Sequence, residues 1–389
     1  MFAKRIQNLA TSPTVAIDSK AKEFKRQGIP VINLSVGEPN FQTPDNIKKA
    51  AHKAIDDGFT FYTSPEGIAE LREAIVKKLA HDNNLSYDIS QIIVGVGAKQ
   101  LLYLAFHVLC QKGDEVIIPT PTWNTFVEQV KLAEGKPVII TLNPPFHLTA
   151  KDVEKAITAK TKLLLLNTPS NPTGAMIFPE ELKKIADLAV KNNIIVIADE
   201  IYEKLIYSQQ HISIASLNEK IKERTVTING ASKAYAMTGW RIGYAAGPKE
   251  IIEKMKALQS QLLSHASSIS QVAAIEAING DQKSVEMMRK AFAKRREFCI
   301  KQFSEIKELS FTIPEGAFYL FISIEKLLGK RYPTATAWAE ALLEKEKVAV
   351  VPGEAFFYPG YIRISYAASD EDLKEAVKKI GQFINDSKK

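Results

Sequence analysis

Short apolar runs alternate with amphipathic helical stretches between about residues 90 and 250, and this alternation constrains the fold more than any other feature. Two of the runs, KLLLL and NIIVIA, contain no alternating polar residues, as expected for strands buried on both faces. The pattern predicts an α/β core with a mostly parallel seven-stranded sheet sandwiched by helices. The seven predicted strands are QIIVGVG, DEVIIPT, KPVIIT, TKLLLLN, NNIIVIADE, RTVTING and RIGYAAG.

The pattern changes after about residue 285, where a long charged helix is followed by short strands and a final amphipathic helix. This order is typical of a second, smaller α+β unit. The first residues contain no repeated strand–helix unit. We therefore predict an N-terminal arm that forms part of the small domain over residues 1–45, a large domain over 46–285 that carries the candidate site, and a small C-terminal domain over 286–389.

Composition excludes several classes of function. The net charge is +7, but the basic residues are interleaved with Glu and Asp, so we expect solvated helix faces and no nucleic-acid surface. Cys110 and Cys299 lie in no CxxC motif and near no histidine pair, so neither a disulfide framework nor a metal site is expected. No apolar run approaches the ~20 residues of a membrane span. The stretch MFAKRIQNLATSP lacks the apolar segment of a secretory signal, so we expect a cytoplasmic protein with no membrane partner.

Polar residues follow five of the predicted strands. In open α/β sheets ligands bind beyond the carboxyl ends of the strands, so these residues form the candidate site. The first stretch, Gly95–Gln100, is a glycine-containing turn that leads into a helix, where backbone N–H groups bind phosphate well. The alternative is that the glycines only form an ordinary turn before the helix. The stretch matches neither GxGxxG nor a Walker loop. The five stretches are GVGAKQ, PTWN, NTPSNPTG, DEIY and NGASK.

Asp199 and Asn171 each have two interpretations. Asp199 follows an apolar run, so its carboxylate is either solvated at the strand end or paired with a cation in the cleft, such as a protonated pyridine nitrogen. Asn171 either fixes a turn or donates a hydrogen bond to a phenolic oxygen. The residues alone leave both alternatives open.

Lys233 is the candidate nucleophile. A desolvated lysine has a lowered pKa, and its neutral amine attacks carbonyl groups to form Schiff bases. An ordinary surface lysine is the common alternative. A hydrolase dyad of Ser232 and Lys233 is disfavoured, because neither a GxSxG elbow nor an SxxK spacing is present.

Two arginines are candidate anion ligands. Arg241 lies eight residues after Lys233 and precedes a predicted strand, and its guanidinium suits a phosphate. Arg363 lies inside the apolar strand YIRISYA, where a charge is costly without a partner. That partner is either a substrate carboxylate or an Asp or Glu across a domain interface.

Taken together, the motifs resemble the class I aminotransferases of the pyridoxal-phosphate fold-type I family. The resemblance covers nearly the whole chain and is nearest to the bacterial and archaeal-type aspartate aminotransferase subgroup. It is carried by SVGEPNFQTP, YTSPEGIAELREAI, PTWNTF, NTPSNPTG, DEIYE, SKAYAMTGWRIGY, PEGAFYLF and YIRISYA.

The resemblance implies pyridoxal 5′-phosphate as cofactor, bound mainly by the large domain. Lys233 would form the Schiff base and then move the proton, Asp199 would hold the pyridine nitrogen protonated, and Tyr202 with Asn171 would hydrogen-bond the phenolic oxygen. Tyr62 would reach the phosphate of the neighbouring subunit, which implies a homodimer with shared active sites. The other cofactor contacts would come from Gly97, Ala98, Lys99, Trp123, Ser232 and Arg241.

The resemblance also implies the substrates, which are small amino and oxo acids. Arg363 would bind the α-carboxylate while Gly37 closes over it, with Trp123 and Asn171 beside the substrate. Lys99 and Thr14 would bind the distal carboxylate of L-aspartate. Each of these two has an ordinary alternative, as an exposed lysine and a helix cap. The expected reaction transfers the amino group of aspartate to 2-oxoglutarate by a ping-pong mechanism.

Other donors and one other reaction stay open at this point. Aromatic amino acids, alanine or methionine are alternative donors, and a carbon–sulfur lyase of the same fold would keep the same lysine, aspartate and arginine. Use of prephenate is in question, because no basic residue stands at Ala10, Thr11 or Ser12, just before Thr14.

Overall fold

The computed structural model describes residues 4–7, 9 and 13–387, without the side chains of residues 4, 5 and 13–16. A seven-stranded sheet forms its centre, in the order β2-β8-β7-β6-β5-β3-β4. β8 is antiparallel to both of its neighbours and the other pairs are parallel, so the predicted fold class is confirmed. The strands are β2 (Ile92–Gly95), β3 (Glu115–Thr120), β4 (Lys136–Thr141), β5 (Thr161–Asn167), β6 (Ile195–Asp199), β7 (Thr225–Gly230) and β8 (Gly243–Ala246).

Helices cover both faces of this sheet because its central strands are apolar on both sides. Leu163 and Leu165 of β5 pack in the cluster that includes α5, α6 and α11, whereas Leu164 and Leu166 pack in the cluster that includes α7 and α8. α8 begins with Pro179 in its first turn, where the fixed φ of proline suits a helix start. α5 ends at Leu109, since Cys110 is already extended. The helices are α4 (Ala69–Asn83), α5 (Ala98–Leu109), α6 (Asn124–Leu132), α7 (Ala150–Ala156), α8 (Pro179–Lys191), α9 (Glu219–Lys222), α10 (Ala231–Ala234), α11 (Lys249–Leu262) and α12 (Ser268–Asn279).

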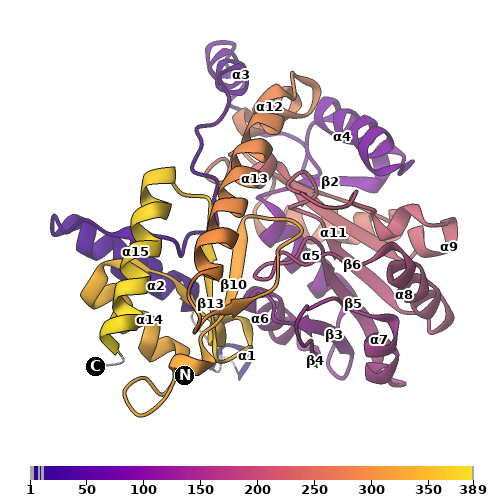
Figure 1. Ribbon diagram of the computed structural model, residues 1–389. Helices are drawn as coiled ribbons and strands as arrows, with labels where there is room; N and C mark the ends of the chain where they lie inside the picture. Colours follow the sequence, from indigo (N-terminus) through magenta and orange to yellow (C-terminus); the bar gives the residue numbers. More distant parts are fainter. Residues whose placement is uncertain (1–3, 8, 10–12, 388–389) are drawn as a thin grey trace.

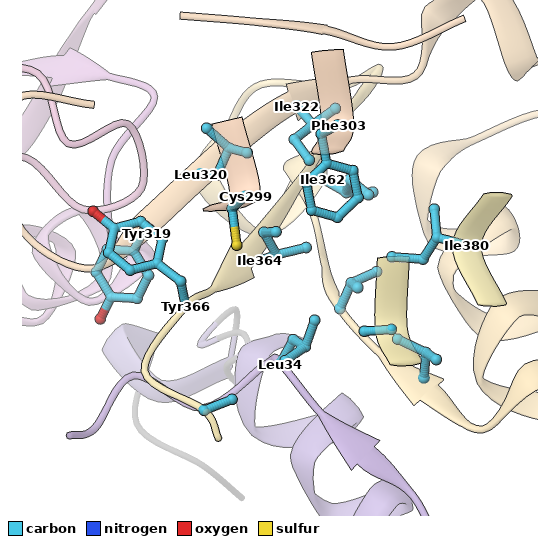
Figure 2. Packing of buried hydrophobic residues seen from close by; sticks show 14 of the residues in the cluster. Leu34, Cys299, Phe303, Tyr319, Leu320, Ile322, Ile362, Ile364, Tyr366 and Ile380 are labelled. Carbon is cyan, nitrogen blue, oxygen red and sulfur yellow. The ribbon is translucent and has the colours of Figure 1, made fainter. Parts of the chain in front are cut away.

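A second unit surrounds a four-stranded antiparallel sheet in the order β12-β13-β10-β9. Its core contains Trp338 and Phe383, and Figure 2 shows Ile362 and Ile364 of β13 packed with Leu320 of β10. In Figure 1 its helices gather on the side away from α7, α8 and α9. The elements are α13 (Lys283–Ser304), β9 (Ser310–Phe311), β10 (Tyr319–Ser323), α14 (Ala335–Glu346), β11 (Val348–Ala349), β12 (Val351–Pro352), β13 (Tyr361–Ser365) and α15 (Asp370–Ser387).

The N-terminal segment packs on this second unit before the chain enters the large sheet. β1 (Ile32–Asn33) pairs in parallel with β11, and the Ser365 amide donates a hydrogen bond of 2.8 Å to the Leu34 carbonyl. Leu34 thereby joins the buried cluster of Figure 2. The helices before and after β1 are α1 (Lys4–Gln7), α2 (Pro13–Arg26) and α3 (Asp45–Asp56). The division into domains at residues 45 and 285 stays a prediction.

Within the described part of the chain, every helix is too short or too polar to span a bilayer. The same described residues also form short 3-10 helices, which are η1 (Ile89–Gln91), η2 (Ile214–Ser216), η3 (Glu325–Leu327) and η4 (Gly353–Phe356).

Candidate active site

The carboxyl ends of β5, β6 and β7 open into one cavity of about 430 Å³. Tyr319 of β10 and Arg363 of β13 line the same cavity, so it lies between the large sheet and the second unit. Residues that are far apart in the sequence therefore meet here. The site residues predicted from the sequence that line the cavity are Gly37, Ala98, Lys99, Trp123, Asn171, Asp199, Tyr202, Ser232, Lys233, Arg241 and Arg363.

Lys233 lies on α10, the single turn of helix that follows β7. Its side chain is half-buried, and Nζ donates a hydrogen bond of 2.6 Å to the carbonyl of Gly37. Burial lowers the pKa of Lys233 to about 8, with the nearby guanidinium groups of Arg363 and Arg241 acting in the same direction. A neutral amine is therefore accessible near physiological pH, which is what attack on a carbonyl carbon requires.

Asp199 is the last residue of β6 and is 3% exposed. Its carboxylate accepts one hydrogen bond, of 3.2 Å from the Ile201 amide. Burial raises the pKa of Asp199 to about 7, although this hydrogen bond and Lys233 act against the shift. A buried carboxylate with so little compensation favours a bound cation beside it.

Tyr202 and Asn171 line the cavity in two separate sets of hydrogen bonds. The hydroxyl groups of Tyr202 and Tyr319 lie 2.7 Å apart, and the Asn171 side-chain oxygen accepts a hydrogen bond of 3.0 Å from Arg363. Asn167 accepts a hydrogen bond of 3.0 Å from the Asn171 amide and donates one of 3.2 Å to the Asp199 carbonyl. Sequence reasoning missed Asn167 and Tyr319, although Asn167 stands directly at the end of the run LLLLN.

Arg363 is 2% exposed in the middle of β13. It donates hydrogen bonds to Asn171 and to the carbonyl of Ser35, and its Nε has no hydrogen-bond partner in the part of the chain that the structure describes. Among the described residues no Asp or Glu forms an ion pair with Arg363. The structure therefore does not support the alternative that Arg363 pairs with an acidic residue across a domain interface. The buried guanidinium thus has room for an anion from the cavity.

A second anion-binding arrangement lies where α5 begins. Gly97 caps this helix with φ +79°, and a Cβ there would lie 2.8 Å from Nη2 of Arg241. A Cβ on Gly243 would lie 2.7 Å from the Ala98 nitrogen, so glycine allows β8 to approach the helix start. Arg241 is exposed and held by the carbonyls of Thr238 and Val96. Helix N–H groups, a guanidinium and the buried Ser232 together suit a phosphate.

Lys99 and Trp123 face each other at the cavity wall. The Lys99 ammonium lies 4.6 Å from the centroid of the Trp123 ring. Lys99 remains exposed as a whole residue, but partial desolvation of its ammonium, together with Arg241, lowers its pKa.

Tyr62 is not part of this cavity. Its side chain is 91% exposed, and its ring meets His265 edge-on at 5.6 Å. The side chain of Thr14 lies outside the described residues.

Comparisons with known proteins identify the family of this chain. The family model for "Aminotransferase class I and II" matches residues 29–380. The chain belongs to this family. It is an aminotransferase, and the family implies pyridoxal phosphate as its cofactor.

The relatives of this aminotransferase match it over its full length. It is 48% identical to an aspartate aminotransferase of Bacillus sp. (strain YM-2), over 99% of each chain. A probable aspartate/prephenate aminotransferase of Rickettsia bellii is 46% identical over 97% of each chain. The solved aspartate aminotransferase of Thermus thermophilus with maleate has a TM-score of 0.94 at 40% identity, covering 98% of this chain and 99% of the other.

The residues of the cavity fit the implied cofactor. The start of α5 with Arg241 suits its phosphate, and the uncompensated Asp199 suits its protonated pyridine nitrogen. Lys233 presents an amine to the same cavity. The aminotransferase thus holds three separate groups that match three parts of one small molecule.

The raised pKa of Asp199 predicts how this carboxyl affects stability without cofactor. Its ordinary pKa is 3.8 and its folded value is about 7, so ionising it costs stability as pH rises through this interval. In cofactor-free protein, Asp199→Asn should stabilise the fold at pH 8, by about 4 kcal/mol at most, and by less at pH 5. Urea unfolding at both pH values measures this, and a pH-independent difference would contradict it.

Proposed function

We propose that this aminotransferase moves the amino group of L-aspartate to 2-oxoglutarate with pyridoxal 5′-phosphate as cofactor. The observation that carries the proposal is that one cavity contains the amine of Lys233 together with two separate cations, Arg363 and Lys99. Aspartate and 2-oxoglutarate are both dicarboxylates. Two cations that line one cavity suit two carboxylates better than they suit an apolar side chain.

The cofactor would be held along its length by residues of different elements. Arg241, Ser232 and the N–H groups at Gly97 and Ala98 would bind the phosphate, and Trp123 would cover the ring. Asp199 would pair with the pyridine nitrogen, while Tyr202 and Asn171 would hydrogen-bond the phenolic oxygen. When bound, the cofactor withdraws electrons from the substrate's α-carbon.

The protein's own contribution would be binding, orientation and proton transfer. Arg363 would bind the α-carboxylate on a rigid strand, and Gly37 would limit access of water from the N-terminal segment. The amine of Lys233, with a pKa lowered by burial, would take the proton from the α-carbon and return it one position away. The second oxo acid would then take up the amino group by the reverse of this sequence, with the same residues in the same roles.

Support for aspartate over other donors comes from the relatives and from Lys99. The Bacillus relative is an aspartate aminotransferase, and the Thermus structure was solved with maleate, which is a four-carbon dicarboxylate. Here Lys99, together with Thr14, would bind the distal carboxylate. Alanine, methionine or aromatic donors would leave Lys99 without an anionic partner.

We also propose that the active enzyme is a cytoplasmic homodimer with shared sites. Phe61 and Tyr62 are adjacent aromatic residues that are 82% and 91% exposed, which is costly unless another surface covers them. Tyr62 would reach the phosphate in the partner's cavity. The unpaired thiols of Cys110 and Cys299 suit a reducing compartment.

A panel of amino donors tests the reaction. With 2-oxoglutarate as acceptor, aspartate should give the highest kcat/KM, and Lys99→Ala should lower that value about tenfold or more while changing the value for alanine little, since an ion pair of about 1.4 kcal/mol is lost. Exposed Lys112 provides the matched control, Lys112→Ala. Lys233→Ala should abolish turnover.

Two outcomes of this panel would contradict the proposal. Release of ammonia and an oxo acid without any 2-oxoglutarate would indicate the carbon–sulfur lyase alternative. An equal loss for aspartate and alanine in Lys99→Ala would contradict the role of Lys99.

Mixed dimers test the shared site. Lys233→Ala chains and Tyr62→Ala chains should each have low activity. A hybrid of the two should recover activity, because one of its two sites combines an intact Lys233 with an intact Tyr62. Chains that carry both substitutions, mixed with Lys233→Ala chains, are the control and should recover nothing. No recovery in the first mixture would show that Tyr62 does not act across the dimer.

A further inference from the structure

Tyr319 connects the second unit to the active site, and no role follows for it from the sequence motifs. It is fully buried at the start of β10, where Tyr319 pairs with Ser365 and Phe321 pairs with Arg363 on β13. Figure 2 shows Tyr319 at one end of the packed cluster, on the strand that also carries Leu320 and Ile322. The core therefore fixes the position of its ring.

Three groups of the site contact this tyrosine. Its hydroxyl lies 2.7 Å from the hydroxyl of Tyr202, and the Arg363 guanidinium carbon lies 4.3 Å from the centroid of its ring. A Cβ on Gly37 would lie 2.7 Å from the same hydroxyl, so the N-terminal segment passes directly over it. Tyr319 touches one residue from each of the three segments that would close around cofactor and substrate.

The direction of the hydrogen bond between the two phenols follows from the number of protons that each hydroxyl can donate. Each hydroxyl has one proton to donate. If Tyr202 donates its proton to the phenolic oxygen of the cofactor, its own oxygen is left to accept one from Tyr319. Burial raises the pKa of both phenols, so both keep their protons over the working range of pH.

We propose that Tyr319 is a positioning residue for the proposed reaction, with two separable parts. Its hydroxyl donates to Tyr202 and so aims the Tyr202 proton at the cofactor's phenolic oxygen. Its ring face supports Arg363 for the substrate carboxylate. The first part strengthens Tyr202 as a donor, because hydrogen bonds in a chain polarise one another. The second is a cation–π contact in a desolvated site. The inference rests on the proposed function.

The hydroxyl is tested by the visible absorption of the bound cofactor as a function of pH. A hydrogen bond to the phenolic oxygen stabilises its anion, so losing part of it raises the pH midpoint of the absorption change. Tyr319→Phe should raise the midpoint by about 0.5 unit and Tyr202→Phe by more, and the double variant should match Tyr202→Phe. Tyr366→Phe is the matched control, since its buried hydroxyl donates 3.3 Å to the Ala317 carbonyl, and it should leave the midpoint unchanged.

The ring is tested with maleate as a dicarboxylate probe on the loaded enzyme. Tyr319→Phe keeps the ring and should change the maleate Kd less than twofold, whereas Tyr319→Leu should raise it about tenfold. Thermal unfolding of each variant shows whether the fold is retained. If Tyr319→Leu does not fold, the role of the Tyr319 hydroxyl is still decided by comparing Tyr319→Phe with the variant that carries both Tyr319→Phe and Tyr202→Phe.

Failure of this inference differs from failure of the proposed function. A wild-type protein that titrates normally with a Tyr319→Phe midpoint equal to its own would overturn the role of the hydroxyl. The role of the hydroxyl would also be overturned if the midpoint shift of the double variant equalled the sum of the shifts of Tyr319→Phe and Tyr202→Phe. A wild-type protein with no cofactor absorption would overturn the proposed function itself, and this inference with it.

Discussion

The arrangement of this protein depends on one constraint, which is the burial of charged groups without ionic partners at the wall of one cavity. Asp199 is 3% exposed and Arg363 is 2% exposed, and neither forms an ion pair among the described residues. Such groups destabilise a fold unless something else satisfies them. Burial raises the pKa of Asp199 and lowers that of Lys233, so it favours the neutral form of each side chain. A charged cofactor and a charged substrate would remove much of this cost.

The rest of the fold supports these charges. Asp199 stands at the end of a strand that is hydrogen-bonded on both sides, and Lys233 is held on the short helix after the neighbouring strand. Arg363 comes from the second unit, so the cavity is complete only when both units are in contact. Tyr319 and the segment at Gly37 meet at this junction. Ligand binding would therefore depend on how the two units are placed relative to each other, because both units contribute contacts to the ligand.

Much of this was accessible from sequence because the large sheet has a simple pattern. Runs such as KLLLL predict buried parallel strands, and the polar residues after them predict the location of the site. Long-range contacts were not accessible in this way. Tyr319 lies within the apolar strand FYLFISI and reads as core, and only its 2.7 Å contact with Tyr202 reveals another role. That Arg363 has no acidic partner among the residues described likewise depends on the packing of the second unit. The order of the motifs along the chain indicated the family. The same motifs gave no information on the role of Tyr319.

The ionisation of Asp199 is the most direct test of the claim that the site's buried charge is compensated by the cofactor. Infrared spectra of protein labelled with ¹³C at aspartate carboxyl groups, taken as the difference between wild type and Asp199→Asn, would isolate this carboxyl. We expect a protonated carboxyl band below pH about 7 in cofactor-free protein. The band should be absent over the same range once pyridoxal phosphate is bound. If Asp199 has the same ionisation in both states, the bound cofactor does not compensate its charge.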